Sequence, residues 1–174
     1  AWKDIIGISE SKIAKLPKKN NWWGLDSGGP CGPDTEIFYW SGEADKIPDS
    51  FNDDNHLWVE IWNNVFMQYD KTGSEYKALD QKNVDTGLGL ERILAVVNGL
   101  ADNYQTDLFI NIIHRLEQLS GEKYGQSAEI SRAMRIIADH LKAATFIMAD
   151  DKGLTPSNTD RGYVLRRLIR RAVR

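Results

Sequence analysis

The residues whose types and spacing most clearly suggest ligand binding form a short segment that ends at Arg92. An apolar helical pattern begins in this segment. Gly87 and Gly89 allow a ligand to approach the backbone closely. The free N–H groups of a first helical turn attract anions, and Arg92 can bind a phosphate through two parallel hydrogen bonds. Asp85 lies just before the turn and can hold an ammonium group, so one segment could contact both ends of an aminoacyl phosphate. An ordinary helix start, with Asp85 or Thr86 as its cap, would give the same pattern.

A second pattern of this kind is the C-terminal stretch 161–174, which contains arginine but no acidic residue. Its arginines are Arg161, Arg166, Arg167, Arg170, Arg171 and Arg174. Because the formal net charge of the chain is −3, the other 160 residues carry −9. Several of the arginines recur one helical turn apart, a spacing at which like charges repel. Nucleic-acid phosphate would relieve that repulsion, and acidic residues elsewhere in the fold are the alternative.

The segment Gly29–Pro33, Gly-Pro-Cys-Gly-Pro, is stiff and turn-forming. It follows Trp22 and Trp23 closely, so it either forms an aromatic wall of a small pocket or a corner that buries tryptophan. Cys31 has no histidine near it in the sequence, which favours a packed thiol over a nucleophile.

Polar residues also interrupt the next predicted strand region, at Glu60, Asn63 and Gln68. They either line a polar cleft or face solvent from a half-exposed sheet. Strand alternation predicts that Glu60 and Asn63 point to opposite faces. The three histidines, His56, His114 and His140, lack metal-ligand spacing, so no metal site is predicted.

The composition is that of an ordinary soluble globular protein, because 41% of the 174 residues are hydrophobic and 27% are charged. Neither a membrane-length apolar run nor a signal peptide is present. A single cysteine excludes an internal disulfide. We therefore expect a cytoplasmic protein.

The elements that must position these residues change type near residue 100. Before it we predict strands, a loop at 20–33, a surface loop at 41–55 and a turn at 70–74, followed by the glycine-flanked helix. The predicted strands are 11–16, 36–40 and 56–69, the last being a strand pair or one long bent strand. After it we predict only helices, one capped by Thr106 and Asp107, one over 128–149 and one from about Asp160. The fold class is therefore α+β, with an antiparallel-sheet region 1–100 followed by a helical region 101–174.

Four segments in order resemble the motifs of alanyl-tRNA synthetases, which are class II aminoacyl-tRNA synthetases. The matching segments are Gly29–Pro33 with the Thr-Glu-Ile that follows, 60–68, 84–92 and 156–167. The resemblance extends over essentially the whole chain. It implies part of a class II catalytic core joined to the start of a tRNA-recognition domain.

The resemblance also implies an activity and roles for individual residues. The parent would activate alanine with ATP, assisted by Mg²⁺, and transfer it to alanine tRNA. Arg92 would be catalytic and would bind the ATP phosphates beside Gly89, while Asp85 would hold the α-ammonium group of alanine. The alanine pocket would be bordered by Trp23, Asn63 and Val65, and Gly87 would leave room for the amino acid. Asn158 would lie near the G·U wobble pair of the acceptor stem, and the arginine helix would bind tRNA.

Two class II signature motifs would precede Ala1, so we expect this chain by itself to be inactive. A tRNA-binding fragment or a synthetase-like paralogue without catalysis remains the alternative. Asp34 stands where several relatives carry another small polar residue or cysteine, and no consequence is attached to it.

Overall fold

The computed structural model describes residues 2–49 and 55–174, and the chain divides into two compact units, Ala1–Gly99 and Leu100–Arg174. Part of the predicted surface loop, residues 50–54, lies outside the described residues. Within the described ranges, no helix combines the length and the apolar character that a membrane span requires.

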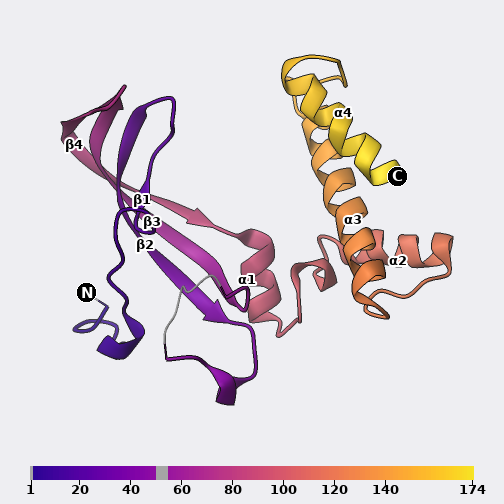
Figure 1. The fold of residues 1–174 in the computed structure, drawn as a ribbon, viewed down its shortest axis with the longest axis horizontal. Coiled ribbons are helices and arrows are strands. Elements are labelled where there is room, and N and C mark those ends of the chain that lie inside the picture. The colour runs from indigo at the N-terminus through magenta and orange to yellow at the C-terminus, as the bar shows by residue number, and fades with distance from the viewer. Residues whose placement is uncertain (1, 50–54) are drawn as a thin grey trace. The chain divides into compact units, whose positions relative to one another are not determined.

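The first unit contains a four-stranded antiparallel sheet in the order β1–β2–β3–β4 (Figure 1). Its strands are β1 Trp22–Trp23, β2 Gly29–Trp40, β3 Trp58–Thr72 and β4 Glu75–Leu88. Residues 58–69 of the predicted region 56–69 thus belong to one long strand and not to a strand pair. Gly73 turns the chain between β3 and β4 with a positive φ of 61°, which a glycine adopts without steric cost. Helix α1, Leu90–Val97, follows β4 directly.

The strand predicted at 11–16 is wrong. This part of the chain contains a short 3-10 helix, η1 Glu10–Lys12, and irregular backbone. A strand needs a partner for its hydrogen bonds, and the outer edge of β2 is paired with Trp22 and Trp23 instead. A second 3-10 helix, η2 Ala44–Lys46, lies in the loop after β2.

The loop predicted for 20–33 is wrong in two places, because it contains β1 and because β2 already begins at Gly29. The pairing of β2 with β3 shifts register between Cys31 and Asp34, so a bulge admits the glycine and proline residues. Gly32 is required there, since a Cβ built on it would overlap the carbonyl oxygen of Phe66 on β3. Cys31 is buried and unbonded, as expected for a packed thiol.

The alternative interpretation of the glycine-flanked segment, an ordinary helix start capped by Asp85 or Thr86, is wrong. Asp85 and Thr86 do not cap it, because both lie within β4, whose pairing with β3 continues to Leu88. The N-cap position is Gly89, and no side chain caps the helix.

The second unit is helical, with η3 Asn103–Gln105, α2 Ile110–Ser120, α3 Ala128–Ala149 and α4 Asp160–Val173. Phe109, Ile113, Met134 and Ala138 form its core between α2 and the N-terminal half of α3. Thr106 and Asp107 do not cap α2, which begins four residues after Thr106. The Thr106 hydroxyl is buried and donates to the carbonyl oxygen of Asn103, at 2.6 Å.

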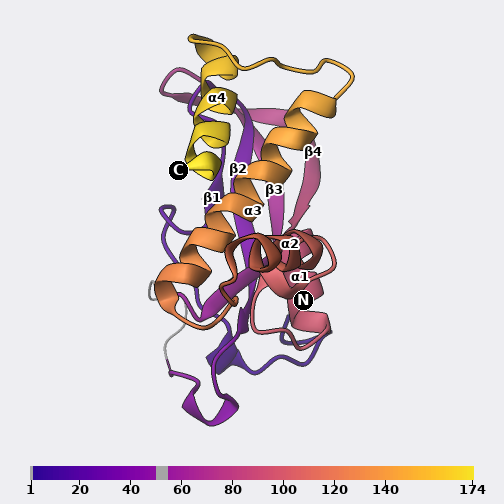
Figure 2. The same ribbon diagram turned by 90° about the vertical axis from the view of Figure 1, so that its right-hand side faces the viewer.

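Helix α4 packs along α3 in an antiparallel pair (Figure 2). The contact buries Leu165 and Ala172 of α4 but leaves the apolar side chain of Val164 56% exposed. Gly162 allows the preceding turn to pack on the helix, because a Cβ there would lie 2.7 Å from the carbonyl oxygen of Thr155.

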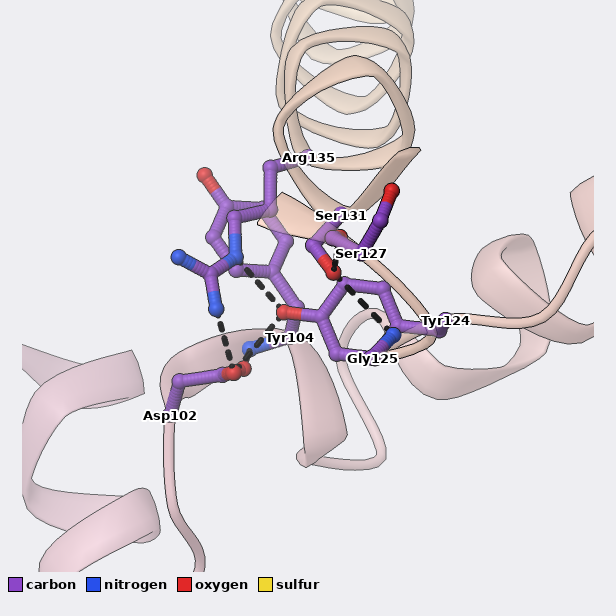
Figure 3. A network of polar contacts seen from close by, with 7 residues as sticks. All are labelled: Asp102, Tyr104, Tyr124, Gly125, Ser127, Ser131 and Arg135. Atoms are coloured by element: carbon purple, nitrogen blue, oxygen red, sulfur yellow. Dashed lines mark hydrogen bonds and ion pairs between the residues drawn. The ribbon is translucent and has the colours of Figure 1, made fainter. Parts of the chain in front are cut away.

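A polar network connects the start of the second unit to α3 (Figure 3). The carboxylate of Asp102 accepts hydrogen bonds from the Tyr124 hydroxyl and from Arg135 Nη2, both at 2.8 Å. Arg135 Nε also donates to the Tyr124 hydroxyl, at 2.6 Å, and Asp102 caps η3 through the Tyr104 N–H. The Tyr124 hydroxyl is a donor at neutral pH, as that of an ordinary tyrosine is, and burial raises its pKa further, to about 12. The network fixes the loop before α3.

Candidate functional site

The central feature of the first unit is a pair of residue rows across one face of the sheet. Strand register places Asp34, Val65 and Asp85 opposite one another on β2, β3 and β4. The next row along the same face contains Glu36, Asn63 and Gly87. Directly paired residues of an antiparallel ladder share a face, and neighbouring strands lie about 4.8 Å apart. Four residues predicted to contact the amino acid or border its pocket, Asn63, Val65, Asp85 and Gly87, therefore gather on one face.

Asn63 joins the two carboxylates of β2. Its Nδ2 lies 3.5 Å from Asp34 Oδ2 and 3.4 Å from Glu36 Oε1, so it donates to both. Asp34 is only 7% exposed. Asp34 Oδ1 and Asn63 Oδ1 are buried without a hydrogen-bond partner among the described residues.

Burial sets the protonation of these carboxyl groups. It raises the pKa of Glu36 to about 7, with additional repulsion from the charges of Glu60 and Asp34. Burial also raises the pKa of Asp34, although hydrogen bonds from Asn63 and Asn21 oppose the change. Asp34 and Glu36 therefore carry less negative charge near neutral pH than the same carboxyl groups would carry in water.

A second bulge moves Glu60 to this face. Ile37 pairs with Trp62 but Phe38 pairs with Glu60, which leaves Ile61 as an extra residue. The prediction that Glu60 and Asn63 point to opposite faces is therefore wrong, because simple alternation fails across a bulge.

Arg92 lies on the first turn of α1 and reaches back to Glu60. Its Nη1 donates to the main-chain carbonyl of Glu60 at 2.8 Å and lies 3.6 Å from the carboxylate oxygen Oε2. Gly89 makes room for this arrangement, since a Cβ there would lie 3.0 Å from Cδ of Arg92. The Arg92 side chain is 48% exposed, so its guanidinium remains accessible to a ligand.

The surroundings of Asp85 and Gly87 have room for a ligand. Asp85 is exposed, and its Oδ1 accepts the N–H of Thr86 at 2.9 Å. A Cβ built on Gly87 would meet no protein atom within 4 Å, and Gly87 is not among the glycines with positive φ. Neither packing nor backbone conformation therefore explains why residue 87 is a glycine.

Trp23 lies on β1, paired with Gly32, and is 39% exposed. Its neighbour Trp22 is held by stacking on Tyr69, with ring centroids 5.7 Å apart. Lys18 Nζ also lies 4.1 Å from the Trp22 ring centroid, a cation–π contact. The described contacts anchor β1 through Trp22 and leave Trp23 at the surface.

In the second unit, a groove of about 550 Å³ is lined by four arginines of α4 and by Arg174, which directly follows the helix. Five of its nine lining residues are arginine and none is acidic; the others include Tyr163 of α4 and His140 of α3. Among the described residues of the second unit, no acidic side chain lines the groove; acidic residues elsewhere in the fold remain the alternative partner for the arginines. Asn158 lies on the exposed turn before α4 and makes no side-chain hydrogen bond within the described part of the chain.

A family described as tRNA synthetases class II (A) matches residues 1–174. The chain belongs to this family. It is 47% identical over 180 residues to a protein of Desulfosudis oleivorans named alanine–tRNA ligase, a match that covers 99% of this chain and 20% of that protein. Proteins of the same name from Borreliella afzelii and Treponema denticola are 50% and 48% identical, with 98% of this chain and 29% of each relative covered. The chain thus spans between a fifth and three tenths of the length of these relatives.

Class II membership agrees with the α+β fold and its antiparallel sheet. No functional role was predicted for Asp34 or Glu36, the two carboxyl groups that contact Asn63. Residues two apart on a strand share a face, so this spacing could have predicted that the two carboxyl groups lie together. The Gly-Pro-rich segment before them did not suggest a strand, and the prediction was therefore missed.

Proposed function

We propose that a full-length protein containing this chain activates alanine with ATP and transfers it to alanine tRNA. The observation that supports this proposal most directly is that one sheet face contains Asp85, Gly87, Asn63 and Val65. Arg92 lies on the helix that follows β4. In this proposal residues 1–100 are the C-terminal part of the class II core, and residues 101–174 begin the helical tRNA-recognition region.

The amino-acid end of the site uses the exposed carboxylate of Asp85. It would bind the α-ammonium group of alanine through a charge-assisted hydrogen bond. The space over Gly87 would take the small substrate, and the nearly buried side chain of Val65 would contact its methyl group. Asn63 and the exposed ring of Trp23 would border this pocket.

The phosphate end uses Arg92 and the open backbone at Gly89. When the alanine carboxylate attacks the α-phosphate of ATP, pyrophosphate leaves and alanyl-adenylate forms. Arg92 would stabilise the charge on the phosphate oxygens, exchanging its contact with Glu60 for a contact with the nucleotide. A tRNA hydroxyl then attacks the carbonyl carbon of the adenylate, and AMP leaves.

Mg²⁺ commonly accompanies ATP in the class II family. Within residues 2–49 and 55–174, no group of three or more His, Cys, Asp or Glu side chains is arranged to hold a metal ion. We therefore assign no step of the reaction to a metal held by these residues.

Helix α4 is the proposed tRNA-binding element. Its arginines would neutralise phosphates of the acceptor stem, and they are Arg161, Arg166, Arg167, Arg170, Arg171 and Arg174. The exposed amide of Asn158 would reach the wobble pair.

Alanine-dependent pyrophosphate exchange and aminoacylation of alanine tRNA by the full-length protein test this function. We expect both activities with the parent and neither with the 174-residue chain alone. An inactive parent that still binds alanine tRNA would instead support a non-catalytic tRNA-binding protein.

A further inference from the structure

We propose that Tyr163 and Arg167 of α4 form a stacking site for an unpaired nucleobase of the RNA that the arginine groove binds. This inference rests on the proposed RNA-binding role of α4. It goes beyond that role because phosphate neutralisation alone requires no aromatic side chain.

The first supporting observation is the position of Tyr163 on the helix. Tyr163, Arg167, Arg170 and Arg174 recur at i, i+4, i+7 and i+11, which places them along one helix face. At a rise of about 1.5 Å per residue, this face extends for roughly 16 Å. The aromatic ring therefore stands at one end of a row of positive charges.

The second observation is that Tyr163 is exposed. Its relative exposure is 44%, and it lines the arginine groove, whereas the buried face of the same helix carries Leu165 and Ala172. The core therefore does not account for the tyrosine. Val164, 56% exposed, adds further apolar surface to the groove.

The third observation is the contact between Tyr163 and Arg167. The guanidinium carbon of Arg167 lies 5.9 Å from the centroid of the Tyr163 ring. Aromatic rings and planar guanidinium groups are the surfaces on which proteins stack unpaired RNA bases. Together with a positively charged groove, they give the usual arrangement for binding a single strand. Because five of the nine lining residues are arginine and none is acidic, the groove's charge complements a nucleic-acid strand.

The test uses the full-length protein and three RNA probes. The first is a blunt-ended hairpin, the second is the same hairpin with a short unpaired extension, and the third is a longer blunt hairpin with as many phosphates as the second. A fluorescent base analogue in the extension reports stacking, and titrations at several salt concentrations give affinity and salt dependence. Tyr163→Phe keeps the ring, Tyr163→Leu keeps apolar bulk without a ring, and Phe146→Ala removes another exposed aromatic residue of the second unit.

We expect Tyr163→Leu to weaken binding of the extended hairpin by about 5- to 150-fold, the range for loss of one base–aromatic stack. Binding of both blunt hairpins and the salt slope should not change. Tyr163→Phe and Phe146→Ala should behave as wild type. Equal loss on extended and blunt probes, or no loss on either, would overturn the stacking site.

This result is separable from the proposed activity. Absence of alanine-dependent exchange in the wild-type parent would refute the ligase function without affecting the comparison of the three probes. Normal exchange with no effect of Tyr163→Leu would refute only the stacking site.

Discussion

Arg92 and Glu60 are joined by a hydrogen bond from the guanidinium Nη1 to the main-chain carbonyl, at 2.8 Å. The carboxylate of Glu60 lies 3.6 Å from the same nitrogen, and both side chains are partly exposed. Exposed ion pairs contribute little to stability. The contact therefore orients Arg92, and breaking it should cost little free energy, which is compatible with the proposed binding of Arg92 to a nucleotide.

Arg92→Ala should reduce adenylate formation by the full-length protein by about 100- to 1000-fold, the usual effect of removing one donor to a developing charge. The fold should survive, because the side chain is largely exposed. Alanine-dependent pyrophosphate exchange at saturating ATP measures the effect, with Arg115→Ala on α2 as a control. Normal exchange by the Arg92 variant would reassign Arg92 to a structural ion pair.

Gly87→Ala should leave folding intact and weaken alanine binding. A Cβ at residue 87 meets no protein atom within 4 Å, so thermal unfolding should match wild type. If alanine occupies that space, the added methyl group should cost about 1–3 kcal/mol and raise the KM for alanine by about 5- to 150-fold. The KM for ATP should change little. Gly32→Ala is the contrasting variant, because its Cβ would overlap Phe66 and should impair folding. An unchanged KM for alanine in Gly87→Ala would remove residue 87 from the pocket.

Asp85→Asn should weaken alanine far more than ATP. Loss of a charge-assisted bond costs about 1.5–3 kcal/mol, which corresponds to roughly 10- to 150-fold in affinity. Steady-state exchange kinetics with each substrate varied separately provide the measurement. Asp80→Asn, an exposed aspartate on the same strand, is the matched control. Equal effects of the two substitutions would argue against a specific role for Asp85.

The helices of the second unit were predictable because their signals are local. The predicted helix 128–149 agrees with α3, Ala128–Ala149, whose N-cap Ser127 accepts the N–H of Ile130 at 3.1 Å. Helix α4 likewise begins at the predicted Asp160. Helix hydrogen bonds join residues four apart, so sequence spacing alone carries this information.

The arrangement of the sheet face was not predictable in the same way. Two bulges decide whether Asp34 and Glu60 lie on the same sheet face as Asn63. A shift of one residue would move a side chain to the other face. Nothing in the local sequence around Ile61 marks it as an extra residue. The local segment suggested that Asp85 could hold an ammonium group and Arg92 a phosphate, the resemblance of whole motifs assigned these groups to alanine and ATP, and both roles remain predictions.

Glu36 should make the first unit less stable as pH rises. Its pKa in the folded state is about 7, compared with 4.5 for an ordinary glutamate. Below 4.5 both states hold the proton, but between 4.5 and 7 the unfolded chain releases it first, which favours unfolding. Glu36→Gln should therefore raise the free energy of unfolding over that of wild type, and this gain should be larger above pH 7 than at acidic pH. The difference should be on the order of 1–2 kcal/mol after allowance for partial solvent screening.

Urea unfolding of the chain across this pH range, followed by tryptophan fluorescence, measures that change; all six tryptophans lie in the first unit. Asp34 titrates in the same direction, so a smaller slope should remain in the variant. Glu75→Gln on β4 replaces an exposed glutamate and should leave the pH dependence as in wild type. An identical pH dependence for Glu36→Gln and wild type would contradict the raised pKa.

The arginines of α4 and Asn158 should affect tRNA in different ways. Changing Arg166, Arg170 and Arg174 to Gln removes phosphate contacts, so tRNA binding should weaken with little sequence preference. Each lost contact should lower the slope of log affinity against log salt by roughly 0.7–0.9. Asn158→Ala should instead cost about 1–3 kcal/mol of discrimination, by analogy with amide recognition of a base edge in DNA.

Aminoacylation of two alanine tRNAs, one with the wobble pair and one with a Watson–Crick pair, separates these roles in the full-length protein. The triple arginine variant should lower both reactions and keep their ratio, whereas Asn158→Ala should change the ratio. Asn111→Ala, an exposed asparagine on α2, is the matched control and should change neither. If Asn158→Ala lowered both reactions equally while the arginine variant changed the ratio, the division into a base-reading residue and phosphate-binding residues would be wrong.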